Sequence, residues 1–197
     1  MKTPRILLAM PSGSGLVPFK VMQHLMGMDF SGFEVTVIGT IRSFIDIARN
    51  TMLEDMVEGG YDAIFFVDDD MLLPSDALRL MWELDKPVVN IPYKGRGGDG
   101  RWILFDKEFK SKQDFTKTCE VGGVGMGCTL IRREVAEELF KECHYPFNLM
   151  ITLEGEKKRL SEDLAFCYMC LGHDIEMWAI HGPQVGHIGD PVVYFNK

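Results

Sequence analysis

The sequence has no apolar run long enough to cross a membrane. Among its 197 residues, no stretch approaches the roughly 18–20 consecutive apolar residues that a spanning helix needs. The N-terminal segment MKTPRILLAMPSGSG has two basic residues and a short apolar run, Arg5 to Met10, which is more typical of a first buried strand than of a signal peptide. These absences lead us to expect a soluble, cytoplasmic protein.

Basic residues are also too few for a protein that binds nucleic acid. The chain has 21 Lys and Arg residues against 29 Asp and Glu residues, which gives a net charge of −8. A duplex-binding protein needs a basic face that displaces counterions, so we exclude nucleic acid as a partner. A single nucleotide is compatible with this charge, because a metal ion and a few local cations can meet its phosphates.

The cysteines show neither a disulfide pattern nor a zinc pattern. Five cysteines are an odd number without regular spacing, which indicates a reducing compartment rather than a disulfide framework. Cys167 and Cys170 form one CxxC, but they fall within a helical pattern and have no second Cys or His pair at a suitable spacing. We therefore expect buried thiols and no zinc site.

Apolar strand-like runs alternate with helical patterns through the first half of the chain. This β-α-β-α-β-α-β order predicts an α/β fold with a mostly parallel central sheet flanked by helices. The predicted strands are Arg5–Met10, Phe33–Gly39, Tyr61–Val67 and Pro87–Pro92. The predicted helices are Phe19–Met26, Ser43–Glu58 and a third that opens at Pro74, with Ser75 as N-cap, and runs to about Leu84.

The second half is less regular and predicts a small antiparallel addition to this sheet. Candidate strands of the addition are Trp102–Asp106 and Thr129–Arg132. Further elements are expected at Arg133–Cys143 and Ser161–Leu171 as helices and at Ile175–Ile180 as a strand. The segment VGGVGMG, residues 121–127, has too much glycine for a regular element. No repeat or linker interrupts the chain, so we expect one domain.

Three consecutive carboxylates, Asp68, Asp69 and Asp70, end the apolar strand Tyr61–Val67. Ligands of open α/β sheets sit beyond the carboxyl ends of the strands, where these residues lie. Alternate side chains of an extended segment share a face, so we expect Asp68 and Asp70 to converge and Asp69 to point elsewhere. Two convergent carboxylates suit Mg²⁺ or Mn²⁺, with positions left for phosphate oxygens. The alternative is a solvated acidic turn that caps the next helix.

Three further polar features have both a functional and a structural explanation. Arg49, with Asn50, falls on the helix before the acidic strand and could equally be an exposed helix charge. Glu162 and Asp163 open a predicted helix, where acidic residues also stabilise the helix dipole. His187 lies in the glycine-flanked loop QVGHIGD, and it is an ordinary packed or solvated histidine unless its partners make it a ligand.

The order of these pieces resembles a known family. The segments ARN, YDAIFFVDDDMLLPSDAL, VGGVGMGCTLIRREV, SEDLAFCYMCLGHDIEMW and VGHIG together are similar to a GT-A glycosyltransferase of the glycosyltransferase 2-like group, between residues 5 and 189. The resemblance implies a Rossmann-like GT-A fold in a single catalytic domain over residues 1–197. Residues 1–92 would form its nucleotide-binding half, and residues 93–197 its acceptor and catalytic half.

The resemblance also implies roles for individual residues. Asp70 would contact the divalent cation, Mn²⁺ or Mg²⁺, while Asp68 faces the ribose or reaches the metal through water and His187 adds a ligand. Asp163 would be the catalytic base, with Glu162 as second choice. The nucleotide would be bound by Pro11, Ser12, Arg49, Asp68 and Asp69. The donor and acceptor loops would contribute Lys94, Arg96, Trp102, Gly125, Met126, Gly127 and the segment His144–Leu160 as a lid.

The implied reaction moves a sugar from a nucleotide-diphosphate sugar, with a UDP-sugar favoured, to a hydroxyl of a glycan or glycoconjugate. One carboxylate base without a protein nucleophile implies a single displacement with inversion. A sugar-1-phosphate nucleotidyltransferase and a non-catalytic nucleotide- or sugar-binding module are the alternatives, although PSGSGLVPFK matches the nucleotidyltransferase signature poorly. A Rossmann dehydrogenase is disfavoured, because the third glycine of GxGxxG is missing after Gly13 and Gly15.

Overall fold

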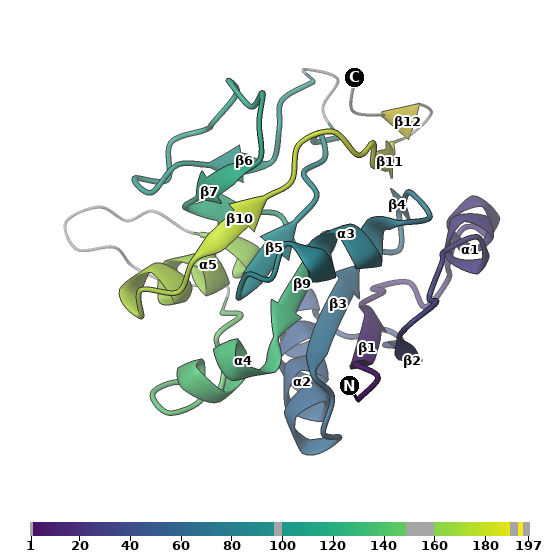
Figure 1. The fold of residues 1–197 in the computed structure, drawn as a ribbon, viewed down its shortest axis with the longest axis horizontal. Coiled ribbons are helices and arrows are strands. Elements are labelled where there is room, and N and C mark those ends of the chain that lie inside the picture. The colour runs from purple at the N-terminus through teal and green to yellow at the C-terminus, as the bar shows by residue number, and fades with distance from the viewer. Residues whose placement is uncertain (1, 97–99, 149–159, 190–192, 195–197) are drawn as a thin grey trace.

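A seven-stranded sheet forms the centre of the fold (Figure 1). The computed structural model describes residues 2–96, 100–148, 160–189 and 193–194 of the chain. The strand order is β2-β1-β3-β9-β5-β10-β7, in which β9 and β7 are antiparallel to their neighbours and the other pairs are parallel. The bounds are Arg5–Met10 (β1), Glu34–Gly39 (β2), Ala63–Val67 (β3), Val88–Asn90 (β5), Cys119–Val121 (β7), Cys128–Arg132 (β9) and Met177–Ala179 (β10). The predicted α/β fold with a mostly parallel sheet is confirmed.

Helices cover both faces of this sheet. Along β1, Leu7 and Ala9 belong to the core on one side, and Ile6, Leu8 and Met10 belong to the core on the other, as the two-residue repeat of a strand requires. None of the helices in the described segments is long and apolar enough to span a membrane. The first side packs against α2 (Ile45–Glu58), α4 (Arg133–Leu139) and α5 (Glu162–Gly172), and the second against α1 (Phe19–Met26) and α3 (Ala77–Glu83).

Two short antiparallel sheets accompany the central one. The first joins β4 (Met71–Leu72), β11 (Gly186–Ile188) and β12 (Val193–Tyr194), and the second joins β6 (Leu104–Phe105) and β8 (Gly123–Val124). In the first sheet, His187 lies opposite Met71, and the Ile188 N–H donates to the Asp70 carbonyl at 2.9 Å. This pairing brings a histidine near the C-terminus to the acidic end of β3.

The prediction that Thr129–Arg132 belongs to the small antiparallel set is wrong. The strand is β9, and it lies inside the central sheet between β3 and β5, antiparallel to both. Its side chains from Cys128 to Ile131 are buried. A strand that is apolar on both faces needs helices on both sides, and the central sheet provides them.

Two smaller predictions are also wrong. Residues 121–127 do contain regular structure, because Gly123–Val124 forms β8 beside β6. A Cβ on Gly122 would lie 2.2 Å from the Asp106 carbonyl oxygen, so glycine here permits the close backbone approach instead of preventing a strand. The N-cap of α3 is Asp76 rather than Ser75, and no side chain caps this helix.

The CxxC of α5 consists of two buried thiols, as predicted. Cys167 and Cys170 are free and fully buried. Burial raises the pKa of both thiols, because the charged thiolate would lose its hydration. They therefore act as small apolar groups of the core.

A buried asparagine ties β5 to the glycine-rich turn before β9. Asn90 is fully buried. Its Nδ2 lies 2.9 Å from the Gly125 carbonyl oxygen, 3.0 Å from the Cys128 carbonyl oxygen and 2.9 Å from Thr129 Oγ1. The Gly125 carbonyl also accepts from Thr129 Oγ1 and the Cys128 carbonyl from the Ile91 N–H, so Asn90 adds a second hydrogen bond to each, typically about 0.5–1.5 kcal/mol apiece. Asn90 therefore stabilises the turn that contacts the end of β3, where Gly127 O accepts the Asp68 N–H at 3.2 Å.

Replacing Asn90 by alanine should lower the free energy of unfolding by about 2–3 kcal/mol, because the buried Gly125 and Cys128 carbonyls each lose one of two donors and the side chain leaves a cavity. Urea denaturation followed by circular dichroism measures this change. Gln23→Ala removes an exposed amide on α1 and should change the free energy by less than about 0.5 kcal/mol. Equal effects of the two substitutions would contradict the role assigned to Asn90.

Candidate active site

The three aspartates after β3 lie in a turn. The Met71 N–H donates to the Asp68 carbonyl at 3.1 Å, and β4 begins at Met71. The prediction of an extended segment, with Asp68 and Asp70 sharing a face, is therefore wrong. The chain turns here because β4 leaves the central sheet to pair with β11. As a result, Asp68, Asp69 and Asp70 each have different side-chain partners.

Asp68 is held by a buried arginine. Arg49, on α2, is only 2% exposed, so it is not the exposed helix charge that the sequence left open. Its Nη2 donates to Asp68 Oδ1 at 3.0 Å, and its Nε lies 3.5 Å from Glu162 Oε1 at the start of α5. Its Nη1 is buried and has no hydrogen-bond partner among the residues that the structure describes. One guanidinium thus joins three elements and leaves the enclosed Nη1 unpartnered within the described part of the chain.

The carboxylates around Arg49 outnumber it. Burial raises the pKa of Asp68, and the negative charges of Asp70 and Asp163 add to this rise although Arg49 opposes it. Burial and then the charge of Asp163 likewise raise the pKa of Glu162. Burial alone would lower the pKa of Arg49, but the attraction of Asp68, Glu162 and Asp163 outweighs it, and the pKa is raised. This cluster, Asp68–Arg49–Glu162–Asp163, therefore favours a positively charged ligand group.

The packing of Tyr93 explains why positions 125 and 127, two of the residues predicted to lie at the donor, are glycines. Tyr93 is 5% exposed, and its hydroxyl accepts the Gly127 N–H at 3.1 Å. A Cβ on Gly125 or Gly127 would lie 2.4 Å or 2.9 Å from Tyr93 Oη, and one on Gly127 would also lie 3.0 Å from Asp68 Oδ2. Burial, followed by the charges of Asp68 and Asp163, raises the pKa of Tyr93 well above its usual value. Here the glycines are required by the packing of Tyr93 against the cluster.

Asp70 and His187 form a second unit of the site. Both are buried, with 8% and 6% exposure, and Asp70 Oδ2 lies 3.2 Å from His187 Nε2. His187 Nδ1 lies 2.8 Å from the Lys94 carbonyl oxygen, which can only accept, so Nδ1 carries the proton. Arg96 Nε lies 3.0 Å from His187 Nε2 and can only donate, so Nε2 presents a lone pair, and Asp70 Oδ2, also an acceptor, is linked to Nε2 through Arg96 rather than by a direct hydrogen bond. This is the tautomer of a metal-binding histidine.

Arg96 occupies the place between these two groups that a cation would take. It contacts Asp70 Oδ2 as well as His187 Nε2, yet its side chain is 65% exposed. Asp70 Oδ1 is buried and has no hydrogen-bond partner within the described ranges. No group of three or more His, Cys, Asp or Glu side chains in those ranges is arranged to hold a metal ion. The side chains of Asp70 and His187 nevertheless fit Mg²⁺ or Mn²⁺, since such ions often bind only one or two protein carboxylates and take their other ligands from substrate phosphates and water.

The third aspartate faces the loop after β1. Ser12 is 4% exposed, and its hydroxyl donates to Asp69 Oδ2 at 2.6 Å. The Ser12 N–H donates to Thr40 Oγ1 at 3.2 Å, which joins the loops that follow β1 and β2. Pro11, between β1 and Ser12, is buried. The structure thus brings together Ser12 and Asp69, two of the residues predicted to bind the nucleotide.

Other predicted residues lie apart from the carboxylates. Lys94 Nζ lies 5.4 Å from the ring centroid of Trp102, which in turn packs against Phe115 beside a small cavity of about 70 Å³. The Met126 side chain is fully buried in the core, so only its backbone can face a ligand. Residues 149–159 of the predicted lid, His144–Leu160, lie outside the described residues.

Sequence reasoning gave no role to Tyr93 or Asn50. Asn50 follows Arg49 on α2, and its amide bonds both backbone groups of Phe147, with Nδ2 2.6 Å from the carbonyl oxygen and Oδ1 3.0 Å from the N–H. A buried polar residue inside a helical apolar pattern was the available signal for Asn50. For Tyr93 there was none, because its partners come from the turn before β9 and from the end of β3.

Comparison with known proteins identifies the fold. No family model and no curated protein matches the sequence. The solved structure of A197 from STIV matches with a TM-score of 0.66 and 20% identity, over 98% of this chain and 94% of that one. S. aureus TarS 1-349, a glycosyltransferase solved in complex with UDP-GlcNAc, matches with a TM-score of 0.55 and 13% identity. The chain has a GT-A-like fold.

At these identities the likeness concerns the fold alone. The match to TarS covers 90% of this chain but only 56% of that one. The sheet nevertheless positions the site where open α/β sheets bind their ligands. The aspartate turn follows β3 and Ser12 follows β1, so both lie at the carboxyl ends of parallel strands.

The raised pKa values predict how stability depends on pH. The folded state holds protons on Asp68 and Glu162 more tightly than the unfolded state, whose carboxyls titrate near 3.8 and 4.5. The stabilisation that these two groups give to the folded state is therefore fully present below pH values of 3.8 and 4.5, and it is lost as the pH rises through their raised pKa values. Asp68→Asn should flatten the decline in the free energy of unfolding as the pH rises above about 4, measured by urea denaturation. Asp76→Asn, an exposed control, should leave the pH dependence of the free energy of unfolding unchanged. If Asp68→Asn showed the same pH dependence as the wild type, the raised pKa of Asp68 would be refuted.

Proposed function

We propose that the chain is a metal-dependent glycosyltransferase that moves a sugar from a nucleotide-diphosphate sugar, with UDP favoured, to an acceptor hydroxyl. The observation that carries this proposal is the buried Asp70–His187 pair, with an unpartnered Asp70 Oδ1 and a His187 Nε2 lone pair. The GT-A-like fold, and the UDP-GlcNAc bound to the distantly similar TarS, support a nucleotide-sugar donor.

Asp70 and His187 are the residues that would hold Mn²⁺ or Mg²⁺. When bound, such a cation stabilises the negative charge that develops on the departing diphosphate. Arg96 would leave Asp70 in this state, and its largely exposed side chain can move to the diphosphate without uncovering the core. Lys94 would support the same end of the donor through the loop that it shares with Arg96, because its carbonyl orients His187.

The nucleotide would lie over the loop after β1. Ser12 and Asp69 are bonded to each other and supply a hydroxyl and a carboxylate there, while Pro11 precedes them. Arg49 would contribute its free Nη1, and Asp68, fixed by Arg49, would face the ribose. These groups are buried or half-buried and already ordered by one another, so they would bind the donor with little rearrangement.

Asp163 is our first choice for the base that takes the proton of the acceptor hydroxyl. Its Oδ1 is bonded to the Ser161 hydroxyl and to the Leu164 N–H, which fixes the carboxylate at the start of α5. Glu162 is the second choice, because Arg49 holds it within the cluster. In a single displacement the acceptor oxygen bonds to the sugar carbon, the bond from that carbon to the diphosphate breaks, and the acceptor proton passes to the carboxylate. The configuration at the sugar carbon is then inverted.

Calorimetric titration with UDP tests the donor and cation sites together. Wild-type protein should bind UDP only when Mn²⁺ is present, and Asp70→Asn should weaken that binding about 10–100-fold. Asp76→Asn, an exposed carboxylate at the start of α3, should bind as the wild type does. UDP binding that is independent of Mn²⁺ and of Asp70 would overturn the proposed cation site.

The catalytic role is tested by release of UDP from UDP-sugars in the presence of Mn²⁺, with water as the acceptor. Asp163→Asn should slow release about 10²–10⁴-fold while UDP affinity stays within about twofold, because the base acts on the acceptor and not on the nucleotide. Glu162→Gln with the larger loss would instead assign the base to Glu162. Tight UDP binding without any turnover of the sugar panel would identify a binding module rather than an enzyme.

A further inference from the structure

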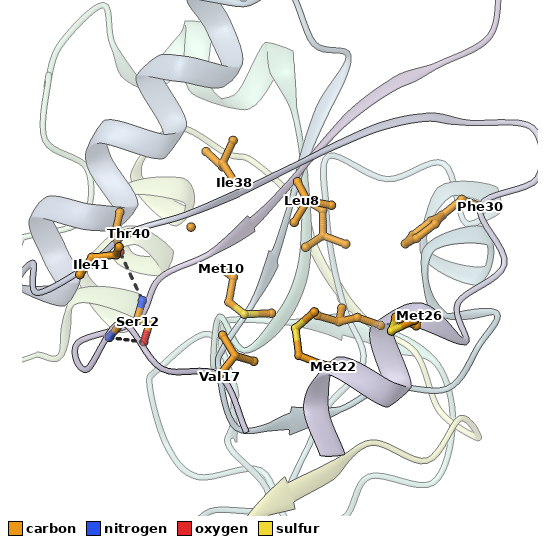
Figure 2. Close-up of a pocket in the computed structure, with 14 residues that line it drawn as sticks. Leu8, Met10, Ser12, Val17, Met22, Met26, Phe30, Ile38, Thr40 and Ile41 are labelled. Atoms are coloured by element: carbon orange, nitrogen blue, oxygen red, sulfur yellow. Dashed lines mark hydrogen bonds between the residues drawn. The ribbon is translucent and has the colours of Figure 1, made fainter. Parts of the chain in front are cut away.

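An apolar groove lies between α1 and the edge strand β2 (Figure 2). It is on the opposite face of the sheet from α2, which carries Arg49. Its volume is about 440 Å³. Leu8 and Met10 of β1 form its floor together with Val37 of β2, which is in register with Leu8. Met22 and Met26 of α1 form a wall, and Figure 2 shows these side chains around an open space. The proposed reaction uses none of these five side chains.

The groove is open because α1 does not cover β2. This helix has eight residues and packs against β4, whereas β2 is the outermost strand of the central sheet. In the floor, Leu8 and Met10 are buried whereas Val37 is 62% exposed, and the rim is exposed as well, with Ile41 at 75% and Met26 at 83%. Gly15 closes one end, since a Cβ there would lie 2.7 Å from Ile41 Cγ2.

Exposed apolar side chains gather along this groove. Ten large apolar side chains are exposed in the part of the chain that the structure describes, and eight of them fall between residues 16 and 47. Four of the eight line the groove itself, namely Met22, Met26, Val37 and Ile41. Exposed apolar side chains gathered in this way mark an interaction site. The eight are Leu16, Phe19, Met22, Met26, Val37, Ile41, Phe44 and Ile47.

The same segments lack acidic residues. Residues 11–28 and 35–45 contain no aspartate or glutamate, although the whole chain has 29 and a net charge of −8. They do contain Lys20 and Arg42, both exposed. This local balance is the reverse of that of the whole chain, and it favours an anionic partner.

Of the three acids that border these segments, two are paired with arginines, and the third, Asp46, has no such partner among the described residues. Asp29 is paired with Arg79, and Glu34 is paired with Arg5 at 3.5 Å. Asp46, at the start of α2, has its Oδ1 buried. Within the described ranges, the exposed Lys20 and Arg42, which flank the groove without lining it, form no ion pair with these acids.

We propose that the groove and its rim dock onto the surface of an anionic lipid bilayer. One acyl chain lies in the groove, the exposed apolar rim enters the interfacial layer, and Lys20 and Arg42 contact head-group phosphates. Apolar side chains combined with basic ones are the usual composition of such surfaces. A second copy of this chain fits less well, because a two-fold contact would bring the same unneutralised cations together.

The groove ends close to the candidate active site. Ser12 lines one end of it and donates a hydrogen bond to Asp69 at 2.6 Å. If the proposed glycosyltransferase function holds, docking would place the transfer site at the lipid surface, where the bilayer presents the acceptor. That consequence rests on the proposed function, whereas lipid binding by the groove does not.

Cosedimentation of the full chain with vesicles tests the proposal. Binding should be strong to phosphatidylcholine vesicles that contain phosphatidylglycerol and weak to pure phosphatidylcholine. Lys20→Gln and Arg42→Gln should each weaken binding about fivefold. Met26→Glu and Ile41→Glu should abolish it, while Tyr145→Glu, an exposed aromatic that does not line the groove, should have no effect.

A groove-filling variant separates insertion of a chain from surface attraction alone. Val37→Trp adds bulk to the floor without changing charge, so the acyl chain should enter less deeply. If about one methylene group of the chain is no longer buried, vesicle binding should weaken at least about fourfold. All these positions are exposed, so the melting temperatures of the variants should match that of the wild type. No binding to either vesicle, equal binding to both, or a dimer that Ile41→Glu dissociates in light scattering would overturn the proposal. If the wild-type protein bound vesicles but did not bind UDP in the presence of Mn²⁺, the glycosyltransferase function would be overturned instead.

Discussion

The buried guanidinium of Arg49 is the interaction on which the candidate site depends. A charge that is 2% exposed is stable only with partners, and Arg49 has Asp68 from the end of β3 and Glu162 from the start of α5. Without it, these carboxylates would face each other with only their raised pKa values to relieve the repulsion. Tyr93 and the glycine-rich turn then pack against Asp68, so the backbone around the site is shaped by the same pair.

The site contains two cations of different character. Arg49 is enclosed and permanently paired, whereas Arg96 is 65% exposed and lies on the Asp70–His187 pair from outside. Because of this difference, Arg49 can serve as part of the framework while Arg96 can be exchanged for another positive group. The fold produces the second pair only where β11 meets β4, so the N-terminal aspartate turn and a histidine near the C-terminus complete each other.

Much of the fold could be predicted from sequence, because β1 is a continuous apolar run and α1 carries a helical apolar pattern within its own residues. The position of β9 could not, since an apolar five-residue run looks the same in a small sheet as in the centre of a large one. The aspartates and His187 could be chosen from motif order, but the turn at Asp68 depends on pairing between β4 and β11. The α1–β2 groove had no sequence signal, because it results from a face that no other described element covers.

The central claim is that Asp70 and His187 together hold a divalent cation that also binds the donor diphosphate. Pulsed electron paramagnetic resonance of Mn²⁺ measures this directly, because nuclei bound to the ion modulate the echo. With protein, Mn²⁺ and UDP, the account predicts one histidine nitrogen coupling and phosphorus coupling in the same spectrum, with the nitrogen signal lost in His187→Gln. Phosphorus coupling without any nitrogen coupling in the wild-type protein would contradict the account, because the ion would then bind the nucleotide and not this pair.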